Sequence, residues 1–123
     1  MRVLVAGSQF WSDWRTITAT LSLVWEPDAV LVTGACPLGA EDLAARCWEH
    51  WGGRVECWPF DWDQPEGQVV VGRHRAMLQA GADTCLSFGS STGPGTLCAL
   101  AREAGVPVYE WRRAPIERSK AGK

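Results

Sequence analysis

Long apolar runs are missing from this sequence of 123 residues. No stretch approaches the roughly 18 consecutive apolar residues that a membrane-spanning helix needs. The N-terminus enters an apolar segment after a single Arg2, without the apolar region and cleavage pattern of a signal peptide. We therefore expect a cytoplasmic protein with no membrane partner.

Metal-binding and disulfide patterns are missing as well. The cysteines stand at positions 36, 47, 57, 85 and 98, with no C-x-x-C pair and no histidine at a zinc-binding spacing. Their odd number, and the place of three of them within apolar patterns, predict reduced thiols. We expect no metal site and no required cofactor.

Basic charge is scarce before residue 112. Residues 1–111 hold seven basic and thirteen acidic side chains, a net charge of −6. Nucleic-acid binding needs clustered Lys and Arg, so this charge argues against it. The other five basic residues lie in 112–123, a stretch without periodicity that we expect to be a disordered tail with only weak, salt-sensitive affinity for DNA.

Short apolar runs alternate with segments that have apolar residues at helical spacing. Strands are predicted at 3–6, 29–32, 54–58, 83–88 and 106–109. Helices are predicted from Ser12, as N-cap, to about residue 25, then over 40–51, over 69–80, and from about residue 97 to 105. This alternation predicts one α/β domain over residues 1–111, with a doubly wound, Rossmann-like parallel sheet of about five strands and helices on both faces. Pro107 predicts an edge position for the last strand.

Glycine-bearing polar loops follow three of these strands, at 7–9, 34–39 and 89–96. The C-terminal ends of parallel strands share one edge of the sheet, so the loops should converge there and hold a phosphate or nucleotide. Neither G-x-G-x-x-G nor the P-loop pattern follows a strand, which argues against a standard dehydrogenase and against Mg-ATP chemistry. The expected ligand contacts are Gly7, Ser8, Gln9, Trp11, Gly34, Ala35, Cys36, Gly39, Arg73, Gly89, Ser90, Ser91, Thr92, Gly93, Gly95 and Thr96.

Charged and nucleophilic candidates lie near these loops. Arg73, near the start of the third predicted helix, is either a contact for a charged ligand or a solvated surface arginine. His74 is expected at the surface rather than as a general base. Glu41 and Asp42 suit the start of the second helix, and either carboxylate could instead polarise a water or hold a ribose hydroxyl. Cys36 precedes a helix, but no base is adjacent in sequence, which argues against a nucleophilic role.

Tryptophan is abundant, with eight residues. Trp11 and Trp14 flank the first loop, where they either stack on a base or cap the core. Trp48 and Trp51 lie on one helical stripe and belong either to the core or to a subunit interface. Eight indoles exceed what one small core readily buries, which predicts a homo-oligomer formed through the tryptophan-bearing helices.

Four segments together resemble a known family. Residues 7–11, the Gly-Ala-Cys-Pro loop at 34–40, residues 73–77 and the loop at 93–96 are similar to the YspA-like, cpYpsA-related family of the SLOG superfamily, found in bacteria and phages. That superfamily also contains the lysine-decarboxylase-like LOG proteins and DprA. The resemblance implies a Rossmann-like fold that binds a nucleotide or a nucleotide-derived ligand at the strand ends.

Departures from the family pattern bear on activity. Gln9 stands where an Arg is usual, His74 where an Asn is usual, and Glu41 where an Asp is usual. Ala99 stands where the LOG phosphoribohydrolases carry a catalytic Glu. We therefore expect a sensor, carrier or sequestering module. The alternatives are a LOG-like enzyme that cleaves the N-glycosidic bond of a nucleoside phosphate, using Glu41, Asp42 or Arg73, and, less favoured, a single-stranded DNA binder like DprA.

Overall fold

A computed structural model describes residues 1–34, 37–89 and 94–112 of the chain. Strands and helices alternate strictly along it. The strands are β1 (Arg2–Gly7), β2 (Val30–Thr33), β3 (Arg54–Cys57), β4 (Thr84–Phe88) and β5 (Val108–Trp111). The helices are α1 (Trp14–Val24), α2 (Gly39–His50), α3 (Val69–Gln79) and α4 (Leu97–Glu103).

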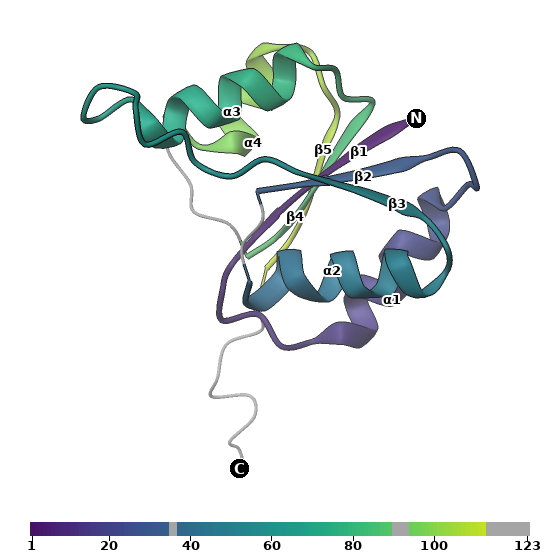
Figure 1. Cartoon of the computed structure of the whole chain (residues 1–123). Coiled ribbons are helices and arrows are strands. Elements are labelled where there is room, and N and C mark those ends of the chain that lie inside the picture. Colours follow the sequence, from purple (N-terminus) through teal and green to yellow (C-terminus); the bar gives the residue numbers. More distant parts are fainter. Residues whose placement is uncertain (35–36, 90–93, 113–123) are drawn as a thin grey trace.

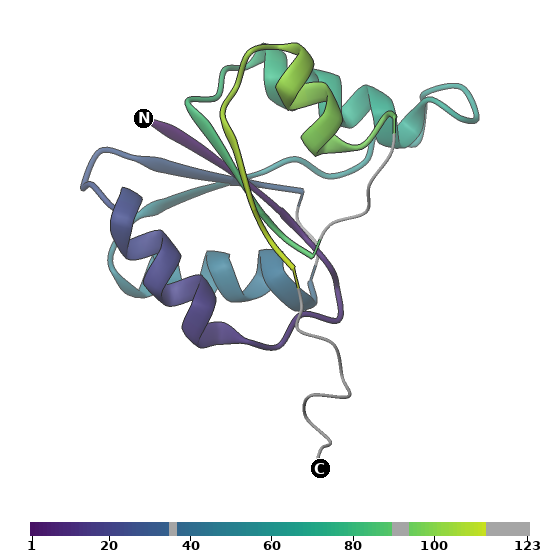
Figure 2. The same ribbon diagram turned by 180° about the vertical axis from the view of Figure 1, so that it is seen from behind.

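All five strands pair in parallel, in the order β3-β2-β1-β4-β5. Helices α1 and α2 cover one face of the sheet, and α3 and α4 cover the other (Figures 1 and 2). This arrangement confirms the predicted doubly wound, Rossmann-like α/β domain. Because β1 is central and lies between β2 and β4, the loops that leave these three strands meet at one edge of the sheet.

The core consists of two apolar layers, one on each face of the sheet. Val3 and Val5 of β1 belong to the layer under α1 and α2, whereas Leu4 and Ala6 belong to the layer under α3 and α4. Every residue of β4 is buried. Strands covered on both faces need apolar side chains at successive positions, which explains the near-continuous apolar runs of the sequence.

Several predicted element ends differ from the structure by one or two residues. Asp13, not Ser12, is the N-cap of α1, because its carboxylate accepts the N–H of Thr16 at 3.1 Å. An N-cap side chain reaches the amide three residues on, and Thr16 stands at that distance from Asp13. Strand β5 starts two residues later than predicted, at Val108, and its edge position is as predicted.

Most of the tryptophans pack in the two core layers. Trp11 and Trp48 are buried, and Trp25, Trp51 and Trp111 pack against the same layer. The Trp25 ring lies edge-on to Trp48 and Trp51, with ring centroids 4.9 and 5.6 Å apart. Trp48 is therefore a core residue, Trp51 packs at the edge of the core, and the homo-oligomer remains a prediction.

Two sequence-based expectations concern the limits of the domain. None of the described helices, of which α2 is the longest with 12 residues, is long and apolar enough to cross a bilayer. Of the predicted tail at 112–123, residues 113–123 lie outside the described residues.

Candidate functional site

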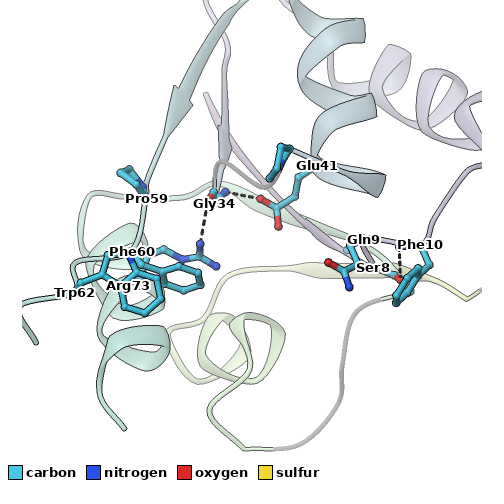
Figure 3. Close-up of a pocket in the computed structure, with 12 residues that line it drawn as sticks. Ser8, Gln9, Phe10, Gly34, Glu41, Pro59, Phe60, Trp62 and Arg73 are labelled. Carbon is cyan, nitrogen blue, oxygen red and sulfur yellow. Dashed lines mark hydrogen bonds between the residues drawn. The ribbon is translucent and has the colours of Figure 1, made fainter. Parts of the chain in front are cut away.

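Two adjoining cavities lie where the C-terminal ends of the strands meet. The first, of about 670 Å³, lies between the loops that follow β1, β2 and β3 (Figure 3). The second, of about 340 Å³, lies between β1, α3 and the turn that precedes α4. Four residues line both cavities: Gly7, Gly34, Glu41 and Arg73.

The loop after β1 is held against the start of α2. The Ser8 carbonyl accepts the N–H of Ala40 at 3.1 Å, and the Ser8 N–H donates to the Phe88 carbonyl at 2.9 Å. Gly39 has a φ of +73°, and a Cβ there would lie 2.3 Å from the Ser8 carbonyl oxygen. Only glycine fits this close approach, so Gly39 builds the site without lining either cavity.

Arg73 lies at the boundary between the two cavities. Its Nη1 donates to the Gly34 carbonyl at 2.9 Å, and its guanidinium carbon lies 4.1 Å from the ring centroid of Phe60. Arg73 is the fifth residue of α3 and is half-buried, so it is not a freely solvated surface arginine. The Gly34 carbonyl and the face of the Phe60 ring thus help to hold a permanent positive charge at the strand ends.

The two acidic candidates of α2 have different places. The Glu41 carboxylate accepts the Gly34 N–H at 2.6 Å and lines both cavities. Asp42 lines neither, and its carboxylate accepts the Arg46 Nε–H at 2.9 Å, one turn along the helix. Among the described lining residues, Glu41 is the one carboxylate that a ligand would meet.

His74 is buried, so its predicted surface position is wrong. The ring faces inward from α3, and Nδ1 lies 3.2 Å from the Gly95 carbonyl oxygen in the wall of the second cavity. A carbonyl only accepts hydrogen bonds, so Nδ1 carries the proton in this contact. Burial lowers the pKa of His74, and the positive charge of Arg73 lowers it further, against the opposing effect of the Gly95 carbonyl.

The third glycine loop is described only in part. Ser90, Ser91, Thr92 and Gly93 lie outside the described residues, as do Ala35 and Cys36 of the second loop. Thr96 lines the second cavity and also caps α4, since its Oγ1 accepts the N–H of Ala99 at 3.2 Å. Gly95 lines the same cavity, whereas Gly89 lines the first.

Comparison with known proteins agrees with this architecture. The model of the YspA, cpYpsA-related SLOG family matches residues 1–64. Over 125 residues the chain is 34% identical to the Gene 61 protein of Mycobacterium phage D29, and the match covers 93% of this chain and 98% of the phage protein. The chain belongs to the YspA, cpYpsA-related SLOG family. The loops at 7–9 and 34–39 of this SLOG protein lie inside the segment that the family model matches.

Three aromatic residues that line the first cavity of the SLOG domain were not among the site residues expected from the sequence. Phe10, Phe60 and Trp62 line the first cavity, the last two from the segment between β3 and α3. The sequence predicts no element there, between the strand at 54–58 and the helix over 69–80. The available signal was its position after a parallel strand, which places it at the same edge as the glycine loops. Trp11, by contrast, is 5% exposed and lines neither cavity, so it caps the core.

The chemistry open to this SLOG site follows from its charges. Arg73 supplies a fixed cation, Glu41 a carboxylate, and Gly7, Ser8 and Gln9 a polar wall. Within the described ranges, no three His, Cys, Asp or Glu side chains gather in a metal-binding arrangement. At Ala99, where the resemblance to the LOG proteins implies a catalytic Glu, no carboxylate stands at the start of α4.

Proposed function

We propose that this SLOG protein binds a nucleotide or a nucleotide-derived ligand in its two adjoining cavities, as a sensor, carrier or sequestering module. The observation that supports this most is the position of Arg73. Its guanidinium lines both cavities, and it is tethered to Gly34 and to the Phe60 ring. A guanidinium fixed at the strand ends is suited to a phosphate, because it can offer two parallel N–H donors.

Hydrolysis of the N-glycosidic bond of a nucleoside phosphate is the second candidate. It is favoured by one observation, the presence of the Glu41 carboxylate in the lining of both cavities. Against it, the Glu41 carboxylate accepts the Gly34 N–H at 2.6 Å, so one of its oxygens already holds the loop after β2. Ala99 also removes the carboxylate on which the LOG route depends. Binding without turnover is therefore the favoured function.

Calorimetric titration of the full chain with nucleoside monophosphates and ADP-ribose tests the proposal. We expect saturable binding by the wild type, and at least tenfold weaker binding by Arg73→Gln, in line with loss of a charge-assisted hydrogen bond. Arg75→Gln is the matched control, because Arg75 lies on the same helix, is exposed and lines neither cavity. Equal losses in the two variants, or no binding by the wild type, would overturn the proposal.

Chromatography of the same incubations separates the two candidate functions. A binding module returns each nucleotide intact. Release of free base that Glu41→Gln abolishes would establish the hydrolase instead.

A further inference from the structure

Two aromatic side chains form one wall of the first cavity. Phe60 and Trp62 stand on the segment between β3 and α3, with ring centroids 5.3 Å apart and ring planes inclined by 56°. Trp62 is 77% exposed, although its indole is among the largest apolar groups in the chain. Covering such a ring with an apolar or aromatic surface is favourable, so this wall is suited to a planar partner.

The wall faces two polar residues and one exposed aromatic residue across the cavity. Figure 3 shows Phe60, Trp62 and Arg73 on one side, Ser8, Gln9 and Phe10 on the other, and Gly34 and Glu41 between them. A volume of about 670 Å³ with aromatic rings and a few polar groups lies within the range of small-molecule sites. The cavity therefore has room for a ring system as well as the group that carries it.

The second cavity differs in its lining. Its described apolar residues are aliphatic or sulfur-bearing, among them Val70, Val71, Met77 and Leu97, with no Phe, Tyr or Trp. Among the described lining residues, a flat ring meets Phe or Trp side chains in the first cavity, whereas the second cavity offers the smaller imidazole of His74. Arg73 lines both cavities, so a ligand that reaches from one to the other passes its guanidinium.

We propose that Trp62, supported by Phe60, stacks on the heteroaromatic base of a nucleotide, while Arg73 binds the phosphate at the boundary with the second cavity. The inference rests on the proposed function and names the ligand class as nucleoside monophosphates. Arg73 already covers part of Phe60, at 4.1 Å from its centroid, which leaves Trp62 as the more accessible ring. Purine nucleotides bind more tightly than pyrimidine nucleotides, because the larger ring system overlaps more of the indole.

Titration calorimetry of wild type, Trp62→Leu and Trp62→Phe with AMP, GMP, CMP, UMP and ribose 5-phosphate tests the stacking. Trp62→Leu keeps an apolar side chain but removes the ring, and we expect it to weaken binding of AMP and GMP by about tenfold or more. Its affinity for ribose 5-phosphate stays unchanged, and Trp62→Phe restores most of the affinity for the purines. Trp14→Leu is the control, because Trp14 is also exposed, at 55%, and lines neither cavity.

The outcomes separate this inference from the function on which it rests. Nucleotide binding that Trp62→Leu leaves unchanged overturns the stacking and leaves the proposed function standing. An equal loss for ribose 5-phosphate shows that Trp62 only shapes the cavity, and also overturns the stacking. Failure of the wild type to bind any of the five phosphates overturns both. Because the indole is largely exposed, the variants are expected to fold, which circular dichroism verifies.

Discussion

The guanidinium of Arg73 fills the space that a side chain at Gly34 would need. A Cβ built on Gly34 would lie 2.6 Å from Nη1, 2.7 Å from Cζ and 2.9 Å from Nη2 of Arg73. The same arginine donates to the Gly34 carbonyl, 39 residues earlier in the chain. A glycine at the end of β2 thus sets where the cation of α3 can stand.

Replacement of Gly34 by alanine is expected to separate binding from folding. The atoms in the way are the far end of a flexible side chain, so Gly34→Ala displaces Arg73 and costs about 1 kcal/mol or less of unfolding free energy. Affinity for a nucleoside monophosphate falls about tenfold, because the charge-assisted contact is misplaced. Urea unfolding and calorimetry measure the two quantities.

Gly72→Ala provides the matched control for this pair. Gly72 lies inside α3 next to Arg73, and a Cβ there has its nearest neighbours 4.0 Å away, in Gln64. Alanine is favoured over glycine in a helix interior by about 0.5–1 kcal/mol, so Gly72→Ala stabilises the fold without changing affinity. Retained affinity in Gly34→Ala would contradict the role given to Arg73.

Burial of His74 predicts a pH-dependent stability. In the folded chain the pKa of His74 lies below its ordinary value of 6.5. Between these two pKa values, the imidazole binds a proton in the unfolded chain but not in the folded chain. The unfolding free energy therefore falls as the pH drops through 6.5, and the fall ends below the folded pKa. The slope is at most that of one proton, about 1.4 kcal/mol per pH unit.

Urea unfolding between pH 8 and pH 5 tests this linkage. His74→Asn keeps an amide donor for the Gly95 carbonyl but does not titrate, so the contribution of this residue to the slope disappears. His50→Asn changes the chain's other histidine, at the exposed end of α2, and should keep that contribution. An unchanged slope in His74→Asn would show that the ring is not protected from protonation.

Glu56 should stabilise the fold above pH 4.5 and lose this effect in stronger acid. Its carboxylate accepts hydrogen bonds from Arg2 at 2.5 Å and from the Trp58 indole N–H at 2.6 Å, which lower its pKa from 4.5 to about 2. With a lowered folded pKa, the stabilisation is present above pH 4.5 and is lost as the pH falls towards 2. The Glu56 side chain is 37% exposed, so Glu56→Gln costs only about 1 kcal/mol or less at pH 7. Unfolding titrations at several pH values should show the two proteins converging below pH 4.5, and a gap that persists to pH 2 would contradict the ion pair.

We predict that the chain self-associates through its tryptophan-bearing helices, α1 and α2. Leu23 on α1 is 83% exposed and Trp14 is 55% exposed, and an opening of about 350 Å³ lies between Ser22, Trp25 and Trp51. Sedimentation velocity at high micromolar concentration is expected to show an oligomer that Leu23→Glu dissociates. Val70→Ser, on α3 across the sheet, should leave it intact. A wild-type protein that sediments only as a monomer would refute the prediction.

The fold was largely predictable from the sequence, because its physical signals are local. Val3 to Ala6 form a continuous apolar run since both faces of β1 are covered, and Pro107 marks an edge because it lacks an N–H. The N-cap of α1 was harder to predict, because Ser12 and Asp13 are both residue types that cap helices. The Thr16 N–H, which donates to the Asp13 carboxylate, decides between them.

Only the part of the candidate site formed by glycine loops after strands was predictable from the sequence. Glycine loops after β1, β2 and β4 mark a shared edge, whereas Phe60 and Trp62 lie in an aperiodic segment whose position depends on the pairing of β3 with β2. His74 was misplaced because the start of α3, with three successive valines, gives no clear apolar face. Its burial follows from packing against the turn that precedes α4, a contact distant in sequence.

The uneven distribution of indoles between the two layers has a spectroscopic consequence. Trp11, Trp25, Trp48, Trp51 and Trp111 pack in or against the layer under α1 and α2, whereas Trp58 alone packs against the layer under α3 and α4. Intrinsic fluorescence therefore reports mainly on the first layer. Loosening of α3 and α4, one of which carries Arg73 and His74, would change the emission little while the far-ultraviolet dichroism falls. A melting curve that differs between these two probes would mark the half of the molecule that bears the cation as an independently mobile unit.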